Sequence, residues 1–307
     1  MTGAAVFAAY AAAAGFGGPA ALCRGWSPRM PRTTMSLWLT LAASWIVAVT
    51  LAALALAAPS MLTWPASHAQ RAGELAGTPG RTVAAGAALL LAAAVVLRAC
   101  WHVARGLARA RRQYRQHSAY LAVAGLPDQA LGAVVLDGSS PAAYCIPRGH
   151  PRVVITASTL SLLTPGQLQA VLAHERAHLR GRHHLILTIA SALGSAFPAI
   201  PLLARAGEEL AVLAEMAADD AAACRHDRAD LAAALVILAR AGVRTTALTA
   251  GGPAAVARIK RLLATAPRPG LPARTARLAA AAAALAIPAV ISCLPLIIAA
   301  CEAAGRG

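Results

Sequence analysis

The strongest chemical signal in the chain is the stretch Thr164-Pro-Gly-Gln-Leu-Gln-Ala-Val-Leu-Ala-His-Glu-Arg-Ala-His-Leu-Arg180. Thr164 can cap a helix, Pro165 suits the first helical position, and Gln167 can reach back to complete a capping box. We therefore predict a helix over Gln167–Arg180.

This helix carries an H-E-x-x-H motif. His174 and His178 are four residues apart on one face, so both imidazoles can bind one metal ion, and Glu175 can reach a water on that ion. The alternative is two surface histidines on a polar helix. The pattern predicts a zinc site, with one Zn²⁺ per chain, in which Glu175 is the catalytic base.

Such a zinc site needs a third protein ligand. Acidic residues are scarce in this chain, yet seven of the twelve lie between positions 208 and 230. Within a predicted helix over about Arg205–Cys224, we expect Glu215 to bind the metal. We expect Asp219 to accept a hydrogen bond from a ligand imidazole and so fix its orientation. Glu208 is the next candidate ligand, and a solvated acidic face is the ordinary alternative.

The composition indicates a membrane protein. Of 307 residues, 58% are apolar and only 13% are charged, against about 25% charged in ordinary soluble domains. Four blocks are long and apolar enough to cross a bilayer: 2–23, 36–58, 82–97 and 278–301. We predict three N-terminal spans within 1–103, a metallopeptidase domain over 104–277, and a C-terminal span with a short outer tail over 278–307.

Arginine placement predicts the orientation. Basic residues gather after the third block and before the fourth, and the net charge is +16. The positive-inside rule therefore places region 98–277 in the cytoplasm and both termini outside. A nucleic-acid patch around Arg105–Arg115 is the weaker interpretation, because arginines next to a membrane are expected from topology alone.

The region around the motif has its own pattern. Three short β-type runs, 133–137, 142–146 and 152–156, predict a small antiparallel sheet. Leu185–Leu203 is uncharged and would pass for a span, but a single crossing would separate Glu215 from the histidines. We expect a helical hairpin broken at Pro198 and Pro201 that returns to the same side.

The order of sheet, H-E-x-x-H helix and E-x-x-x-D helix resembles the gluzincin metallopeptidases. More narrowly, the chain resembles the BlaR/MecR-like beta-lactam sensor-transducers, and it shares a core with the CAAX-prenyl and heat-shock membrane proteases. The segments that carry the resemblance are 143–147, 152–156, 162–168, 171–178 and 215–219. It implies a mainly α membrane protein with about four transmembrane helices and a cytoplasmic α+β domain. It also implies zinc at His174, His178 and Glu215, with Glu175 catalytic.

Two departures qualify the resemblance. Relatives often have Arg-x-Asp after the motif, where this chain has Arg180-Gly-Arg-His183-His184. Beta-lactam sensors also continue into an extracellular penicillin-binding domain, whereas only residues 302–307 follow the fourth predicted span here.

The resemblance implies an endopeptidase that cuts a cytoplasmic winged-helix repressor of the penicillinase-repressor type. The alternatives are membrane-protein quality control and a non-catalytic zinc-fold receptor. Expected partners are the lipid bilayer, the protein substrate and, as an option, a second copy in a homodimer. No direct nucleic-acid binding is expected.

Several residues have secondary roles in this scheme. His183, His184 and His226 are spare imidazoles. His226 is a candidate donor to the oxyanion, and a solvated imidazole is the alternative. Solvation beside arginines is the expectation for His183 and His184. Tyr144 belongs to a strand that could hold substrate by β-augmentation, although packing is its simpler role. The six cysteines form no CxxC pair, so reduced and mostly buried thiols are expected.

Overall fold

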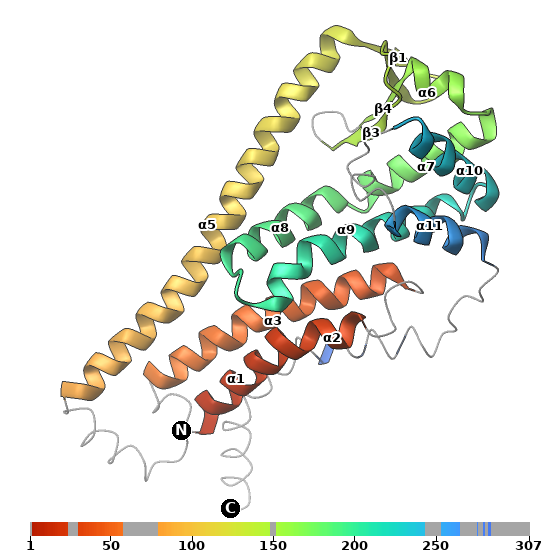
Figure 1. Cartoon of the computed structure of the whole chain (residues 1–307). Coiled ribbons are helices and arrows are strands. Elements are labelled where there is room, and N and C mark those ends of the chain that lie inside the picture. Colours follow the sequence, from red (N-terminus) through yellow and green to blue (C-terminus); the bar gives the residue numbers. More distant parts are fainter. Residues whose placement is uncertain are drawn as a thin grey trace, which may run out of the picture.

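The computed structural model describes residues 2–23, 30–57, 79–147, 152–242 and 253–264, with isolated positions at 275, 279, 282 and 283. Helices dominate, and a small sheet lies at the end of the molecule far from the N-terminal helices (Figure 1). The fourth predicted span, apart from positions 279, 282 and 283, lies outside the described residues.

Three described helices are long and apolar enough to cross a membrane. The first comprises α1 (Thr2–Ala12), the π-helical turn η1 (Ala13–Gly17) and α2 (Gly18–Cys23). The second is α3 (Pro31–Ala57) and the third begins α5 (Pro79–Ala124). These helices confirm the first three apolar blocks as candidate spans. A Cβ at Gly15 would lie 2.9 Å from the indole nitrogen of Trp45, so glycine lets α3 approach closely there.

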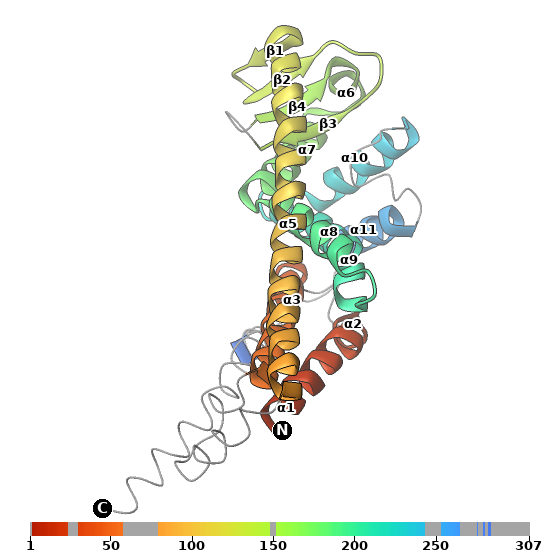
Figure 2. The same ribbon diagram turned by 90° about the vertical axis from the view of Figure 1, so that its left-hand side faces the viewer.

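Helix α5 continues far beyond its apolar half. Its 46 residues give a rod about 69 Å long, whereas the hydrocarbon core of a bilayer is about 30 Å thick. The helix runs from the level of the N-terminal helices to the sheet (Figure 2). It passes through the predicted domain boundary at residue 103 without a break, and the division into domains stays a prediction.

The sheet has four strands in the order β1-β2-β4-β3. They are β1 (Gly125–Asp128), β2 (Ala133–Leu136), β3 (Ala143–Ile146) and β4 (Arg152–Thr156). The three predicted strands are present, but the prediction of a purely antiparallel sheet is wrong, because β2 and β4 run parallel. Val153, Val154 and Ile155 are almost fully buried, so β4 takes the inner position and β3 is displaced to the edge.

Within the described ranges, six helices follow the sheet along the chain. They are α6 (Ala157–Leu162), α7 (Pro165–Arg180), α8 (His183–Ala196), α9 (Pro201–Ala222), α10 (Arg228–Arg240) and α11 (Pro253–Leu263). Helix α7 lies between the sheet, α9 and α10, and it has the predicted capping box at Thr164 and Gln167.

Helices α8 and α9 confirm the predicted hairpin. The chain leaves α8 at Phe197 and re-enters a helix at Pro201, where proline suits the first turn. Phe197 packs edge-on against Trp45 of α3, with ring centroids 5.4 Å apart. The hairpin therefore joins one apolar core with α1 and α3, and the following half of α9 returns towards α7.

The expectation of mostly buried thiols is wrong for the cysteines that the structure describes. Cys23, Cys100 and Cys224 are exposed, and Cys145 is partly buried. The three exposed thiols lie on the outer surfaces or at the ends of helices, where no apolar core covers them.

Candidate metal centre

Helix α7 brings its two motif histidines to one point. Its apolar face is held by the sheet and α10, where Val171 packs with Ile155 and Ala234 in one core cluster. His174 and His178 therefore face α9, and their Nε2 atoms lie 3.1 Å apart. His174 is buried, whereas His178 is partly exposed.

Helix α9 supplies the third member of the cluster. An Oε2 atom of Glu215 lies 3.4 Å from Nε2 of His174, and Oε1 lies 3.3 Å from Nε2 of His178. These three residues form a group that could hold a metal ion. Behind them, Oδ1 of Asp219 lies 3.0 Å from Nδ1 of His174. The structure thus brings together the three predicted metal ligands and Asp219, which was predicted to contact one of them.

The donor set fits a zinc ion. Ligand atoms at corners of a tetrahedron with bonds of about 2.0–2.1 Å are about 3.3 Å apart, which matches the 3.1–3.4 Å separations found here. Two facing imidazole nitrogens can share only one hydrogen bond, and a carboxylate offers no proton. A bound cation would satisfy all three donor atoms at once.

Arg258 of α11 completes the cluster, and its role could not be predicted from the sequence. Its Nε and Nη2 atoms donate to the two carboxylate oxygens of Asp219 at 2.8 and 2.7 Å, and Nη1 lies 2.9 Å from Glu215. Arg258 and Asp219 are both buried. In the sequence, Arg258 is one of several basic residues before the fourth predicted span, so it served only to predict the orientation in the membrane.

The charges in this cluster shift its pKa values strongly. Although burial opposes ionisation, Arg258 and His174 hold the pKa of Asp219 well below its usual range. The same neighbours lower the pKa of Glu215 to about 2 despite its burial. Both carboxylates are therefore ionised at neutral pH and available as acceptors or ligands. Burial, together with the charge of His174, lowers the pKa of His178 to about 3, so its imidazole is neutral.

Glu175 is buried beside the cluster but does not belong to its donor set. Burial raises its pKa to about 7, partly offset by His174. The thiol of Cys145 on the edge strand β3 interacts with this carboxylate, and burial raises the pKa of that thiol to about 12. The edge of the sheet therefore approaches Glu175 directly, which the sequence did not reveal.

His183 was expected to be solvated, and this expectation is wrong. The residue is buried, and its Nδ1 atom lies 3.0 Å from Nδ1 of His178. A Cβ at position 181 would collide with this imidazole, so Gly181 allows it to fold back over the end of α7. Arg182 makes the turn with φ of 49°, the only non-glycine positive φ among the described residues. The strained turn aims His183 at His178.

Three other nominated residues lie elsewhere. Tyr144 shares a hydrogen bond of 2.7 Å with Nε2 of His117 on α5, so it links α5 to β3. Glu208 is exposed on α9, about two turns before Glu215. His226 lies half-buried in the turn after α9, and no described contact connects it to the cluster. The oxyanion role of His226 stays a prediction.

Comparison with known proteins gives a family match for part of the chain. Residues 107–211 match the model of peptidase family M48. No solved structure matches the chain. The matched range contains both motif histidines and Glu175, and it ends four residues before Glu215. It supports a metallopeptidase, and the three apolar helices indicate that it is associated with a membrane.

Proposed function

We propose that this chain is a membrane-bound, zinc-dependent endopeptidase of the gluzincin type. The observation that carries the proposal is the convergence of His174, His178 and Glu215 with donor atoms 3.1–3.4 Å apart. The match of residues 107–211 to peptidase family M48 supports the same chemistry.

The residues have distinct roles in this mechanism. A zinc ion bound by His174, His178 and Glu215 would polarise the scissile carbonyl and acidify a coordinated water. Glu175 accepts a proton from the attacking water and returns it to the leaving amine. A base with a pKa near the working pH suits this exchange, and burial moves Glu175 in that direction. Asp219 contacts the ligand His174, and Arg258 contacts Asp219, so these two residues position the ligands without binding the metal.

The experiment compares zinc content and casein cleavage for detergent-purified wild type and Glu175→Gln. We expect about one zinc per chain in both proteins and cleavage only by wild type. Since Glu175 is no metal ligand in this scheme, loss of zinc in the variant would contradict its role. The absence of zinc from both proteins would refute the proposed function.

The proposed topology places the metal centre in the cytoplasm and the N-terminus outside. It is supported by the arginines that follow the apolar half of α5. Labelling of single cysteines in intact cells tests it. A residue such as Cys224 should react only with a membrane-permeant reagent, whereas reaction with an impermeant reagent would reverse the orientation.

The proposed substrate is a cytoplasmic winged-helix repressor, and the rival is a set of misfolded membrane proteins. The first rests on the resemblance to sensor-transducers and the second on the resemblance to heat-shock membrane proteases. Co-expression with a repressor and with a misfolded membrane protein separates them. Cleavage at one site in the repressor supports signalling, and broad cleavage of the membrane protein supports quality control.

A further inference from the structure

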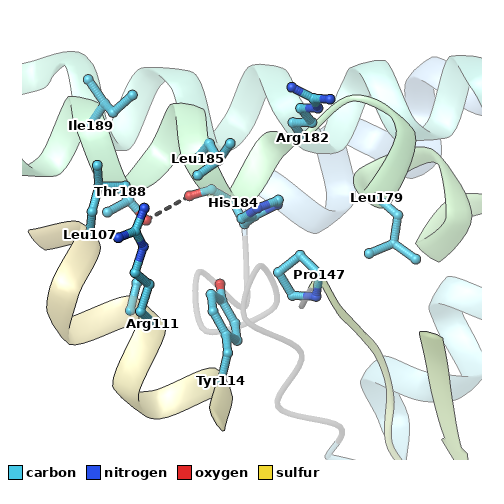
Figure 3. Close-up of a pocket in the computed structure, with 11 residues that line it drawn as sticks. Leu107, Arg111, Tyr114, Pro147, Leu179, Arg182, His184, Leu185, Thr188 and Ile189 are labelled. Atoms are coloured by element: carbon cyan, nitrogen blue, oxygen red, sulfur yellow. Dashed lines mark hydrogen bonds between the residues drawn. The ribbon is translucent and has the colours of Figure 1, made fainter. Parts of the chain in front are cut away.

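A cavity of about 750 Å³ lies between α5 and α8, and the function proposed above does not use it (Figure 3). The cytoplasmic half of α5 forms one wall, the first half of α8 forms another, and the residue after β3 closes one end. Apolar and basic side chains both line it. The residues that matter here are Leu107, Arg111, Tyr114, Pro147, Leu185 and Ile189.

The cavity begins close to the metal cluster. Leu179 lines it and directly follows His178, while Pro147 lines it and directly follows strand β3. Cys145 of β3 interacts with Glu175. Because a strand advances about 3.3 Å per residue, a peptide lying along β3 with its scissile bond near Glu175 would enter the cavity two residues later. Strand β3 is at the edge of the described sheet, where such pairing is available.

The basic lining residues lack acidic partners. Arg111 and Arg182 are exposed, and within the described ranges no carboxylate lies at ion-pair distance from either. Arg111 extends from α5 towards α8, and the hydroxyl of Tyr114 points the same way (Figure 3). By contrast, Arg258 and Arg261 each contact a carboxylate. The cavity therefore offers apolar walls and an uncompensated positive charge.

The position of the cavity favours a peptide over a lipid headgroup. Arg111 is thirteen residues beyond Arg98, where the apolar half of α5 ends, which is about 20 Å along the helix. The headgroup layer adds only about 5–8 Å on each side of the hydrocarbon core. A cavity of this volume is within the usual range for bound ligands.

We propose that this cavity is a specificity subsite for the peptide substrate. It binds the segment two to four residues from the scissile bond and selects a bulky apolar residue beside an acidic one. The apolar side chain packs against Leu107, Leu185 and Ile189, and the acidic side chain pairs with Arg111. This inference rests on the proposed peptidase function and adds the class of sequence that the enzyme cleaves.

Two measurements test the subsite with full-length protein in detergent. The first is cleavage-site profiling of a casein-derived peptide library with wild type, Arg111→Glu and the control Arg115→Glu. Arg115 is on the same helix and exposed, but it does not line this cavity. We expect acidic residues to be enriched two to four positions from the cleaved bond for wild type and the control. Arg111→Glu should lower kcat/KM for such peptides by roughly threefold to tenfold.

The second measurement separates binding from catalysis. In a Glu175→Gln background, fluorescence anisotropy compares matched peptides that contain Glu-Leu or Lys-Leu. Preference for the acidic peptide, lost in Arg111→Glu, supports the subsite even if wild type cleaves nothing, an outcome that would refute only the peptidase function. Equal binding of both peptides, or a wild-type profile retained by Arg111→Glu, would overturn the subsite. Displacement by phosphatidylglycerol without any peptide preference would do the same.

Discussion

Arg258 shows how much the centre depends on one residue outside the motif. Its guanidinium contacts both Asp219 and Glu215, so it offsets part of the negative charge of two neighbouring carboxylates. The H-E-x-x-H and E-x-x-x-D spacings could be predicted from the sequence because helical periodicity fixes them. Arg258 is 39 residues from Asp219, and only the tertiary packing of α11 brings the two together.

Replacing Arg258 should therefore damage both stability and metal binding. Arg258→Ala leaves buried carboxylates unpaired, so we expect a loss of about 3–5 kcal/mol in the free energy of unfolding. Zinc affinity should fall by about tenfold to a hundredfold. Arg261→Ala is the matched control, because Arg261 pairs with the more exposed Asp220. Its cost should stay below about 1 kcal/mol. Denaturant titration and zinc competition measure both effects, and equal losses in the two variants would contradict this account.

Cys145 should be chemically inert in the folded protein. Burial raises the pKa of its thiol to about 12, so the reactive thiolate is scarce at pH 8 and forms only as the pH rises towards that value. Iodoacetamide at pH 8 should modify exposed Cys224 in the native protein and reach Cys145 only after unfolding. Peptide mass spectrometry reads both sites. Rapid native modification of Cys145 would show that the thiol is not buried in the folded protein.

At the scale of elements, the hairpin α8–α9 determines where the carboxylates of α9 lie. Gly194 allows the two helices to approach, since a Cβ there would lie 2.8 Å from the carbonyl oxygen of Leu203. The two prolines in the uncharged run, together with the need to keep Glu215 on the side of the histidines, were enough to predict a return to the same side. The tightness of the contact could not be predicted, because it depends on one missing methyl group.

Gly194→Ala should accordingly destabilise the protein by about 1–3 kcal/mol, the usual cost of overpacking. Gly86→Ala is the control, because nothing lies within 4 Å of a Cβ there. Alanine is a better helix former than glycine, so this control should be neutral or stabilising by up to about 1 kcal/mol. Thermal unfolding in one detergent compares them. Stabilisation of both variants would mean that the hairpin is looser than described.

In the sheet, the presence of β1 and the order of the strands could not be predicted from the sequence. Runs of Val, Ile and Ala marked β2, β3 and β4, but Leu126-Pro127-Asp128 of β1 has none of the usual strand composition. Strand order was also hidden, because it follows from how deeply each run is buried. Val154 and Ile155 are fully buried, and this places β4 inside the sheet.

At the scale of the whole molecule, the candidate metal centre draws its residues from three helices. His174 and His178 come from α7, Glu215 comes from α9, and Arg258 of α11 contacts both Glu215 and Asp219. An ion at this point would cross-link the core around the sheet to the hairpin that packs on α1 and α3.

Metal removal should therefore lower the melting temperature of the entire protein. A ligand that binds only the native state stabilises it by about 2.7 kcal/mol at a hundredfold excess over Kd. EDTA should lower Tm in wild type and Glu175→Gln to the same extent, and it should leave His174→Ala unchanged. Differential scanning fluorimetry provides the measurement. An EDTA effect that persists in His174→Ala would indicate a different metal site.

Helix α5 also constrains how the two ends of the molecule can move. It is one unbroken rod from Pro79 to Ala124, and its far end is tied to the edge strand through His117 and Tyr144. For a rod about 69 Å long, a lean of about 5° at one end displaces the other end by about 6 Å. That displacement exceeds the spacing of about 4.8 Å between paired strands. Any rocking of α5 within the bilayer must therefore carry β3 with it or break their shared hydrogen bond, so the membrane helix acts on the edge strand as a lever with a long arm.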